Sequence, residues 1–311
     1  NKASFAAVRG LSLHMREGEI LALLGHNGAG KSSTIKAMLS LVAPSQGSIS
    51  VFGLSTQSQA ARVRAVTGVC PQHDILWPEL SARQHLRLFA HIRGVPWSKV
   101  EAMVEEKLEA VRLTNVGSRP AGTYSGGMRR RLSVAIATIG DVRFVVLDEP
   151  TTGMDVVNRQ HVWRMIQRLK AGRIVLVTSH SMLECDTLGD KIAIMTAGRL
   201  SCVGDSLHLK NAYGSGYSIA IIAAAPEAVS EITEAMGEVA PLATVGSVRG
   251  RKVNFAFQSE AAVASVPHVF AWIETVPNLI SDWGVSQTTL EDVFLNVGKL
   301  EEESKAQHEW Q

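Results

Sequence analysis

The sequence GHNGAGKS occupies residues 25–32 and decides the fold of the chain's first part. It follows the apolar segment Ile20–Leu24, which has the composition of a buried strand, and it precedes a helical pattern that begins at Lys31. In the pattern GxxxxGK[ST], backbone N–H groups turn around an anion at the positive end of a helix. We therefore predict a loop that binds the phosphates of a nucleoside triphosphate, in preference to a glycine-rich turn without a function.

Each residue of this loop has an expected role. Lys31 would neutralise the β- and γ-phosphates, and the Ser32 hydroxyl would ligate Mg²⁺. The expected ligands are a nucleoside triphosphate and Mg²⁺, and the family resemblance described below implies that the nucleotide is ATP. The residues predicted to bind the nucleotide here are Gly25, Asn27, Gly28, Ala29, Gly30, Lys31, Ser32 and Ser33.

Two acids end a second apolar strand, FVVLDE at residues 144–149. Burying acids at a strand end is unfavourable unless they act on a cation or a proton. Asp148 is predicted to hold Mg²⁺, directly or through water, and Glu149 to polarise the attacking water. Two ordinary loop acids are the alternative, and the phosphate loop makes it less probable.

Two further polar residues follow apolar strands. His180 comes after 174–178 and is predicted to meet the γ-phosphate. Gln72 comes after 66–69 and is predicted to reach the metal or the water. In isolation each would be an unremarkable structural residue, so these roles depend on the phosphate loop.

Strand-like and helical segments alternate up to about residue 210, which favours an α/β fold with a mainly parallel sheet. We expect a nucleotide-binding domain over 1–212, with a helical subdomain at about 73–140. The expected strands are 11–13, 20–24, 48–52, 66–69, 144–147, 174–178 and 192–195, and the expected helices are 31–41, 82–93, 99–111, 129–139 and 158–170.

A glycine-containing hinge near Tyr213 predicts a second domain over 213–299, followed by a polar tail at 300–311. Its segments give the order β-α-β-β-α-β plus a helix, as in ferredoxin-like domains, with Pro267 interrupting the second helix. The last helix would open with a capping box from Thr288 to Glu291. We find no catalytic constellation in this domain, so it is a packing appendage or a regulatory unit.

Composition excludes several classes of protein. The formal net charge is +2, which argues against nucleic acid as a partner, and 46% of the residues are hydrophobic, which excludes a disordered chain. No apolar run approaches the roughly 20 residues that a membrane-spanning helix needs. Three cysteines without a CxxC pair fit a reducing compartment. The chain starts at Asn1 without Met, which suggests a piece of a longer protein.

The sequence YSGGMRRRLS at 124–133 precedes the strand that carries the acids. Ser125, Gly126 and Gly127 would form a second anion-binding helix start. Arg129–Arg131 would oppose that helix's dipole, so they are expected near an anion or on a solvated face. With the phosphate loop, Gln72, the acid pair and His180, this segment resembles the nucleotide-binding domain of an ATP-binding cassette (ABC) transporter, over roughly residues 7–205.

The resemblance implies an ATPase in which two cassettes face each other head to tail. Each nucleotide would lie between one phosphate loop and the opposite Ser125–Gly127 turn, and Asp155 would lie in the loop that crosses the seam. The implied catalytic residues are Glu149, His180, Gln72 and Lys31, and the implied metal ligands are Ser32, Asp148 and Gln72. The segment Gln72–Trp77 would pass motion to transmembrane domains, which implies a location at the cytoplasmic face of a membrane.

Other segments are similar to the A subfamily of lipid exporters, among them CPQH at 70–73, RPAGT at 119–123, TGMD at 152–155 and VSQTTLEDVFL at 285–295. This implies lipid export, with the lipid bound elsewhere, and a regulatory second domain. An ATPase subunit of a bacterial-type drug exporter and a soluble cassette ATPase remain alternatives. Met128 stands where cassettes commonly have Gln, and the adenine-stacking aromatic would fall before Asn1, because Phe5 is too close to the loop.

Overall fold

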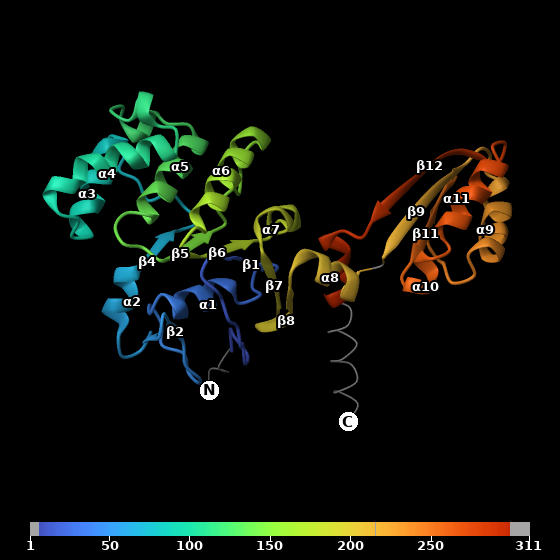
Figure 1. The fold of residues 1–311 in the computed structure, drawn as a ribbon, viewed down its shortest axis with the longest axis horizontal. Coiled ribbons are helices and arrows are strands. Elements are labelled where there is room, and N and C mark those ends of the chain that lie inside the picture. Colours follow the sequence, from blue (N-terminus) through green and yellow to red (C-terminus); the bar gives the residue numbers. More distant parts are fainter. Residues whose placement is uncertain (1–5, 215, 299–311) are drawn as a thin grey trace, which may run out of the picture. The chain divides into compact units, whose positions relative to one another are not determined.

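The computed structural model describes residues 6–214 and 216–298 (Figure 1). The chain divides into two compact units between Asp205 and Ser206. This division falls one helix earlier than the expected boundary after residue 212. Helix α8 (Ser206–Tyr213) belongs to the second unit, where the Tyr213 carbonyl accepts a hydrogen bond from Asn296 Nδ2 at 3.0 Å. The expected tail at 300–311 and Phe5 lie outside the described residues.

The first unit is built on a six-stranded sheet that is parallel except for its last strand. Its central strand β1 is buried along its whole length, as the apolar sequence predicted. The carboxyl ends of the neighbouring parallel strands therefore meet at one edge, where ligands bind in folds of this class. In spatial order the strands are β4 (Thr67–Cys70), β5 (Phe144–Asp148), β6 (Ile174–Ser179), β1 (Ile20–Leu24), β7 (Lys191–Thr196) and β8 (Arg199–Gly204).

Helices pack on this sheet and also form a separate helical cluster (Figure 1). In that cluster α3, α4 and α5 contact one another around a core of their own, which includes Leu86, Val104 and Leu132. The helices of the first unit are α1 (Lys31–Met38), α2 (Ala60–Val66), α3 (Ala82–Ile92), α4 (Trp97–Ala110), α5 (Gly126–Ala137), α6 (Val156–Leu169) and α7 (Met182–Leu188), with short 3₁₀ turns η1 (Thr114–Val116) and η2 (Ala121–Thr123).

Two of the expected strands of the first unit are corrected by the structure. Residues 11–13 form no strand, although Leu11 and Leu13 pack against the core of the sheet. Residues 48–52 yield only β2 (Ser50–Val51), which pairs with β3 (Leu54–Ser55) in a short hairpin. The chain turns there because Phe52 and Gly53 both have positive φ, 51° and 77°. Helices α2 and α7 and strand β8 were not predicted.

The second unit has the predicted β-α-β-β-α-β order and a four-stranded antiparallel sheet in the spatial order β10-β11-β9-β12. Ile232 and Met236 face its core, and Pro267 lies in the first turn of α11 after a break in the helix. The elements are β9 (Tyr217–Ala223), α9 (Ala228–Val239), β10 (Thr244–Arg249), β11 (Lys252–Phe257), α10 (Glu260–Val263), α11 (Val266–Thr275) and β12 (Ile280–Gln287).

A last helix covers 290–298, and its capping box differs from the prediction by one residue. Thr288 is buried and its hydroxyl donates to the Gly216 carbonyl, so the capping bonds form between Thr289 and Asp292 instead. Within 6–214 and 216–298, no helix combines the length and the apolar character that crossing a bilayer requires.

Candidate functional site

The phosphate loop joins β1 to α1 and has the backbone shape that its glycines predict. Gly30 has φ +103°, and a Cβ atom there would lie 2.6 Å from the Ala7 carbonyl oxygen, so only glycine fits. Gly30 also precedes the first residue of α1 without a side-chain cap, which leaves the positive end of that helix available to an anion.

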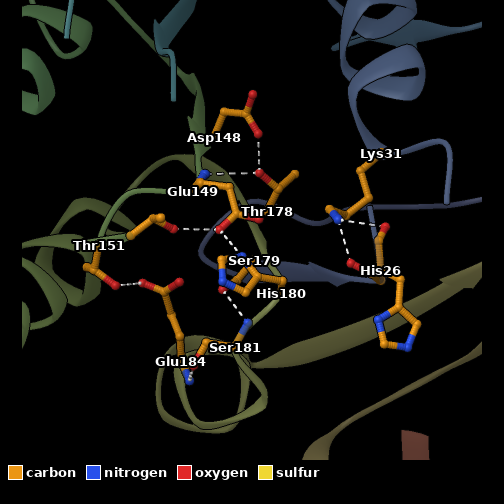
Figure 2. A network of polar contacts seen from close by, with 12 residues as sticks. His26, Lys31, Asp148, Glu149, Thr151, Thr178, Ser179, His180, Ser181 and Glu184 are labelled. Atoms are coloured by element: carbon orange, nitrogen blue, oxygen red, sulfur yellow. Dashed lines mark hydrogen bonds and ion pairs between the residues drawn. The ribbon is translucent and has the colours of Figure 1, made fainter. Parts of the chain in front are cut away.

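Lys31 is buried beneath the loop. Its Nζ donates hydrogen bonds to the carbonyls of Gly25 and His26, the second at 3.2 Å (Figure 2). The ammonium group is therefore held by its own loop, at the place where phosphates would be neutralised.

A hollow of about 260 Å³ opens beside this loop and collects most of the predicted site. Gly25 does not line it, because this glycine packs against β7 with the Met195 carbonyl 2.6 Å from the position of a Cβ atom. The structure adds Ala7 and His26, which the sequence did not single out. The predicted residues that line the hollow are Asn27, Gly28, Ala29, Gly30, Lys31, Ser32, Ser33, Gln72, Asp148 and Glu149.

The acid pair ends β5, and its two carboxylates point apart (Figure 2). Thr178 on the neighbouring strand β6 connects them, because its hydroxyl donates to Asp148 Oδ1 at 2.5 Å and accepts from the Glu149 N–H at 3.1 Å. Glu149 has φ +50°, a strained conformation for a non-glycine residue that recurs at active sites. The unusual backbone conformation at Glu149 accompanies the different directions of the two neighbouring carboxylates (Figure 2).

Glu149 and His180 are in direct contact. The Nδ1 atom of His180 lies 2.8 Å from Glu149 Oε2, which also accepts a hydrogen bond from the Thr152 hydroxyl at 2.8 Å. The Glu149 side chain is buried, whereas that of His180 is 56% exposed. In the described residues Oε1 of Glu149 has no hydrogen-bond partner, so this oxygen is available as an acceptor.

A second buried carboxylate fixes the segment that follows the acid pair. Glu184 Oε1 accepts hydrogen bonds from the Thr151 hydroxyl at 2.6 Å and from Trp163 Nε1 at 3.0 Å. Glu184 lies on α7 and Trp163 on α6. The loop beyond Glu149 is thereby attached to both helices.

Arg130 does not lie on a solvated face, which is one of the two expected environments of these arginines, whereas the other, an anion, is provided by Asp74. The Arg130 side chain is buried and donates to backbone carbonyls at the end of β5: to Asp148 at 2.7 Å, Glu149 at 3.1 Å and Pro150 at 2.9 Å. Arg130 lies on the face of α5 that turns toward the sheet, so its charge is satisfied by these carbonyls.

The same guanidinium also reaches the segment after β4. Nη1 donates to the Pro71 carbonyl and forms an ion pair with Asp74 at 3.2 Å. Arg130 therefore connects α5, which starts at the Ser125–Gly127 turn, to the segment of Gln72 and to the acid pair, a role that was not predicted from the sequence.

The predicted second anion site lies at the start of α5, and none of its three residues lines the 260 Å³ hollow. Ser125 caps the helix by accepting from the Met128 N–H at 3.3 Å. Gly127 packs on Asn158, whose side chain is 2.8 Å from the position of a Cβ atom. Asp155 caps α6 and accepts from both nitrogens of Asn158, and the bond to the Asn158 backbone N–H lowers the pKa of Asp155.

The donor groups around the hollow fit ATP and Mg²⁺. The hydroxyl of Ser32, the carboxylate of Asp148 and the amide of Gln72 offer hard oxygen atoms, which Mg²⁺ prefers. The helix start and Lys31 provide the positive charge that phosphates need. These groups come from three separate segments that the sheet brings to one edge.

A family description named ABC transporter matches residues 8–152. The A family member 1 of Dictyostelium discoideum is 41% identical over 304 residues, which cover 96% of this chain and 35% of that protein. The chain belongs to the ABC transporter family. The human ABC sub-family A member 2 is 42% identical over 97% of the chain, and the human phospholipid-transporting ATPase ABCA3 is 38% identical over 96%.

The resemblance to the A subfamily is thus confirmed, and it includes the second unit of the cassette chain. The chain spans only 12% and 18% of the length of the two human relatives. A solved structure of an ATP-binding subunit of an ABC transporter is 27% identical with a TM-score of 0.61, covering 67% of this chain and 87% of the other. A dimeric cassette bound to ADP and Pi, 20% identical with a TM-score of 0.59, shares the fold over 66% of this chain and 93% of the other.

Proposed function

We propose that this ABC cassette binds Mg·ATP and hydrolyses it to power transport. The observation that carries the proposal is the position of Glu149. One of its carboxylate oxygens is fixed by His180 and Thr152, the other is without a partner in the described chain, and the residue lines the hollow of the phosphate loop.

The phosphate-binding and metal-binding groups of the hollow have defined parts in this proposal. The loop amides and Lys31 bind the β- and γ-phosphates, and Ser32, Asp148 and Gln72 hold Mg²⁺. The ion, when bound, offsets the charge of the phosphate oxygens. Thr178 keeps Asp148 oriented, since its hydroxyl is fixed between the two acids.

The chemical step is an attack of water on the γ-phosphorus, which breaks the bond to the β-phosphate oxygen and releases ADP and phosphate. Glu149 Oε1 accepts the proton of the water. His180 contributes by holding Oε2 through Nδ1, and we propose that its exposed ring contacts the γ-phosphate when the nucleotide binds. General-base assistance of this kind typically accelerates a reaction by ~10²–10⁴-fold.

We further propose that two cassettes pair head to tail, each presenting its Ser125 turn to the nucleotide of the other. Support comes from the place of this turn outside the chain's own phosphate hollow and from the dimeric state of a similar cassette. Asn158 bonds Asp155 and also packs on Gly127. The loop of Asp155, which would cross between the two cassettes, therefore lies beside the Ser125–Gly127 turn.

The transported substrate is proposed to be a lipid that never touches the cassette. Support comes from the name of a relative, a phospholipid-transporting ATPase. Transmembrane domains of the same full-length protein would contact the segment Gln72–Trp77, where Ile75 and Trp77 are exposed. This location corresponds to the cytoplasmic face of a membrane. The similarity to A-family members, 37–42% over nearly the whole chain, favours this reading over a subunit of a bacterial-type drug exporter.

The hydrolysis proposal is tested by Glu149→Gln, with the exposed Glu109→Gln as the matched control. The first variant should lose at least 100-fold in steady-state phosphate release while it retains ATP binding, and the control should match the parent. Parent-like turnover in Glu149→Gln would remove Glu149 from the mechanism.

Pairing is tested by sedimentation of Glu149→Gln with Mg·ATP. A nucleotide-dependent dimer should form, and it should disappear when Ser125→Glu is added, because a carboxylate would face the γ-phosphate. Ser58→Glu, an exposed serine elsewhere in the unit, should leave the dimer intact. A dimer that survives Ser125→Glu would contradict the head-to-tail arrangement.

A further inference from the structure

A second hollow lies apart from the phosphate loop, between the end of α4, the helix α5 and the helix α6. Its volume is about 40 Å³. Cationic side chains dominate its lining, and nothing in the proposed hydrolysis uses them. The polar residues that line it are Arg112, Arg131, His161, Arg164 and Arg168.

The four arginines of this hollow have no acidic partner. Among the described residues, no carboxylate oxygen lies within 4.0 Å of any of their guanidinium groups. Ion pairs elsewhere in the unit, such as Arg83–Glu105 and Arg87–Glu101, show that arginines of this chain pair with acids where acids are near. Positive charge is therefore concentrated here without compensation by an anion of the protein.

Backbone carbonyls hold part of this cluster in place. Arg131 donates through Nη1 to the carbonyl of Val111 at 2.9 Å, and through Nε to that of Gly127 at 3.3 Å. The end of α4 adds the partial negative charge of a helix C-terminus, about half an elementary charge. This is much less than four guanidinium charges, so the hollow keeps a strong positive potential.

His161 behaves as a neutral group in this environment. Its Nε2 accepts a hydrogen bond from Arg112 Nη1 at 2.6 Å. Burial, followed by the charges of Arg112 and Arg164, lowers the pKa of His161. The arginines thus disfavour the protonated form of the His161 ring. His161 acts as a neutral hydrogen-bond acceptor at the edge of the hollow.

We propose that this hollow binds one phosphate group. A volume of about 40 Å³ corresponds to roughly three waters at 10–15 Å³ each, which suits a single tetrahedral oxyanion. Guanidinium forks match phosphate oxygens through paired hydrogen bonds. The phosphate is either free inorganic phosphate or the exposed monoester of a phosphatidate headgroup. Arg131 also donates a hydrogen bond to the Gly127 carbonyl, so the site is connected to the Ser125–Gly127 turn.

The test uses the full chain saturated with Mg²⁺ and a non-hydrolysable ATP analogue, which occupies the phosphate loop. Inorganic phosphate is titrated at constant ionic strength, and Tm is recorded. The parent should show a saturable rise. Arg164→Gln combined with Arg168→Gln should need at least tenfold more phosphate for the same rise in Tm, because two guanidinium groups are removed from the hollow. The double variant should still fold, since both residues are exposed and Gln suits a helix. The charge-matched control is Arg62→Gln with Arg199→Gln, both exposed, which should follow the parent.

A second measurement identifies the source of the phosphate and does not depend on Tm. Vesicles of phosphatidylcholine with or without phosphatidate are sedimented with each protein, and the Nε–H resonance of Arg131 is followed in the phosphate titration. Phosphatidate-dependent sedimentation that the double variant loses assigns a headgroup, and an Arg131 shift without sedimentation assigns free phosphate. The proposal is overturned if the parent and the double variant respond alike to phosphate, or if neither ligand affects the parent.

Discussion

Arg130 donates a hydrogen bond from Nη2 to the backbone carbonyl of Glu149 at 3.1 Å, and the same guanidinium reaches the Pro71 carbonyl next to Gln72. The buried guanidinium of Arg130 thus stabilises the strained backbone of Glu149 through the Glu149 carbonyl. This contact stabilises both residues, because an unpaired buried charge and an unsatisfied buried carbonyl are both unfavourable.

Replacing Arg130 by Met should therefore lower the free energy of unfolding by about 3 kcal/mol, because a buried cation is removed from several acceptors. Arg129→Met is the matched control. Within the described part of the chain, the Arg129 side chain donates only to the Tyr124 carbonyl, so a loss of about 1 kcal/mol is expected. Denaturant unfolding measures both values. Equal losses in free energy of unfolding would show that the buried contacts of Arg130 contribute no more to stability than the single contact of Arg129.

Two neighbouring glycines should respond differently to alanine. Gly127→Ala would place a Cβ 2.8 Å from the Asn158 side chain and should destabilise the unit by about 1–3 kcal/mol. At Gly126 a Cβ meets nothing within 4 Å, so Gly126→Ala should be neutral or slightly stabilising. Thermal unfolding of both variants checks this. A Gly127→Ala protein as stable as the parent would show that Asn158 moves freely.

Thr178 should control the orientation of the acid pair. Thr178→Val keeps the shape of the side chain but removes the hydroxyl that bonds Asp148 and the Glu149 N–H. We expect a cost of about 1–3 kcal/mol in stability and a higher Mg²⁺ concentration for half-maximal ATP binding. Thr178→Ser retains the hydroxyl and should behave like the parent in the Mg²⁺ titration. Identical Mg²⁺ dependence in the Val variant would argue against this role.

His85 should make stability depend on pH. It is buried, its Nε2 accepts from the Trp77 N–H at 2.9 Å, and its Nδ1 lies 2.9 Å from the Ser81 carbonyl, so the neutral ring carries its proton on Nδ1. Burial lowers the pKa of His85 below its ordinary value of 6.5. Between the two pKa values the unfolded chain binds more protons, so stability is full above pH 6.5 and falls as the pH drops through the folded-state pKa.

An imidazole NMR titration should accordingly give His85 a pKa below 6.5. In denaturant unfolding, the His85→Asn variant should lose less stability than the parent between pH 7.5 and 5.5. A normal His85 titration would mean that the loop at Trp77 opens to solvent.

The sequence predicts the parts of the site that are contiguous. The loop at 25–32, the acids at 148–149 and His180 each follow an apolar strand, and parallel strands necessarily bring their carboxyl ends to one edge. The pairing of β7 with β8 and the hairpin at Phe52 were missed, because a turn with φ > 0 at a non-glycine residue has no clear signal in composition.

Arg130 shows why tertiary roles are harder to predict. Three consecutive arginines look alike in a sequence, yet only Arg130 is fully buried. A signal does exist, since the buried residues Gly127, Arg130, Val134 and Ala137 recur at intervals of three and four on one face of α5. The acceptors of Arg130 are distant along the chain, so the periodicity could identify the buried face but not its partners.

The ammonium group of Lys31 already has hydrogen-bond acceptors in its own loop, so phosphate oxygens would compete with these acceptors. Without them the buried ammonium would be unsatisfied, which would destabilise the loop. Any phosphate oxygen that binds this ammonium group competes with the carbonyls of Gly25 and His26. The contribution of Lys31 to ATP affinity then equals the difference between its binding to phosphate oxygens and its binding to the two carbonyls. Lys31→Met should therefore lower both the stability of the fold and the affinity for ATP.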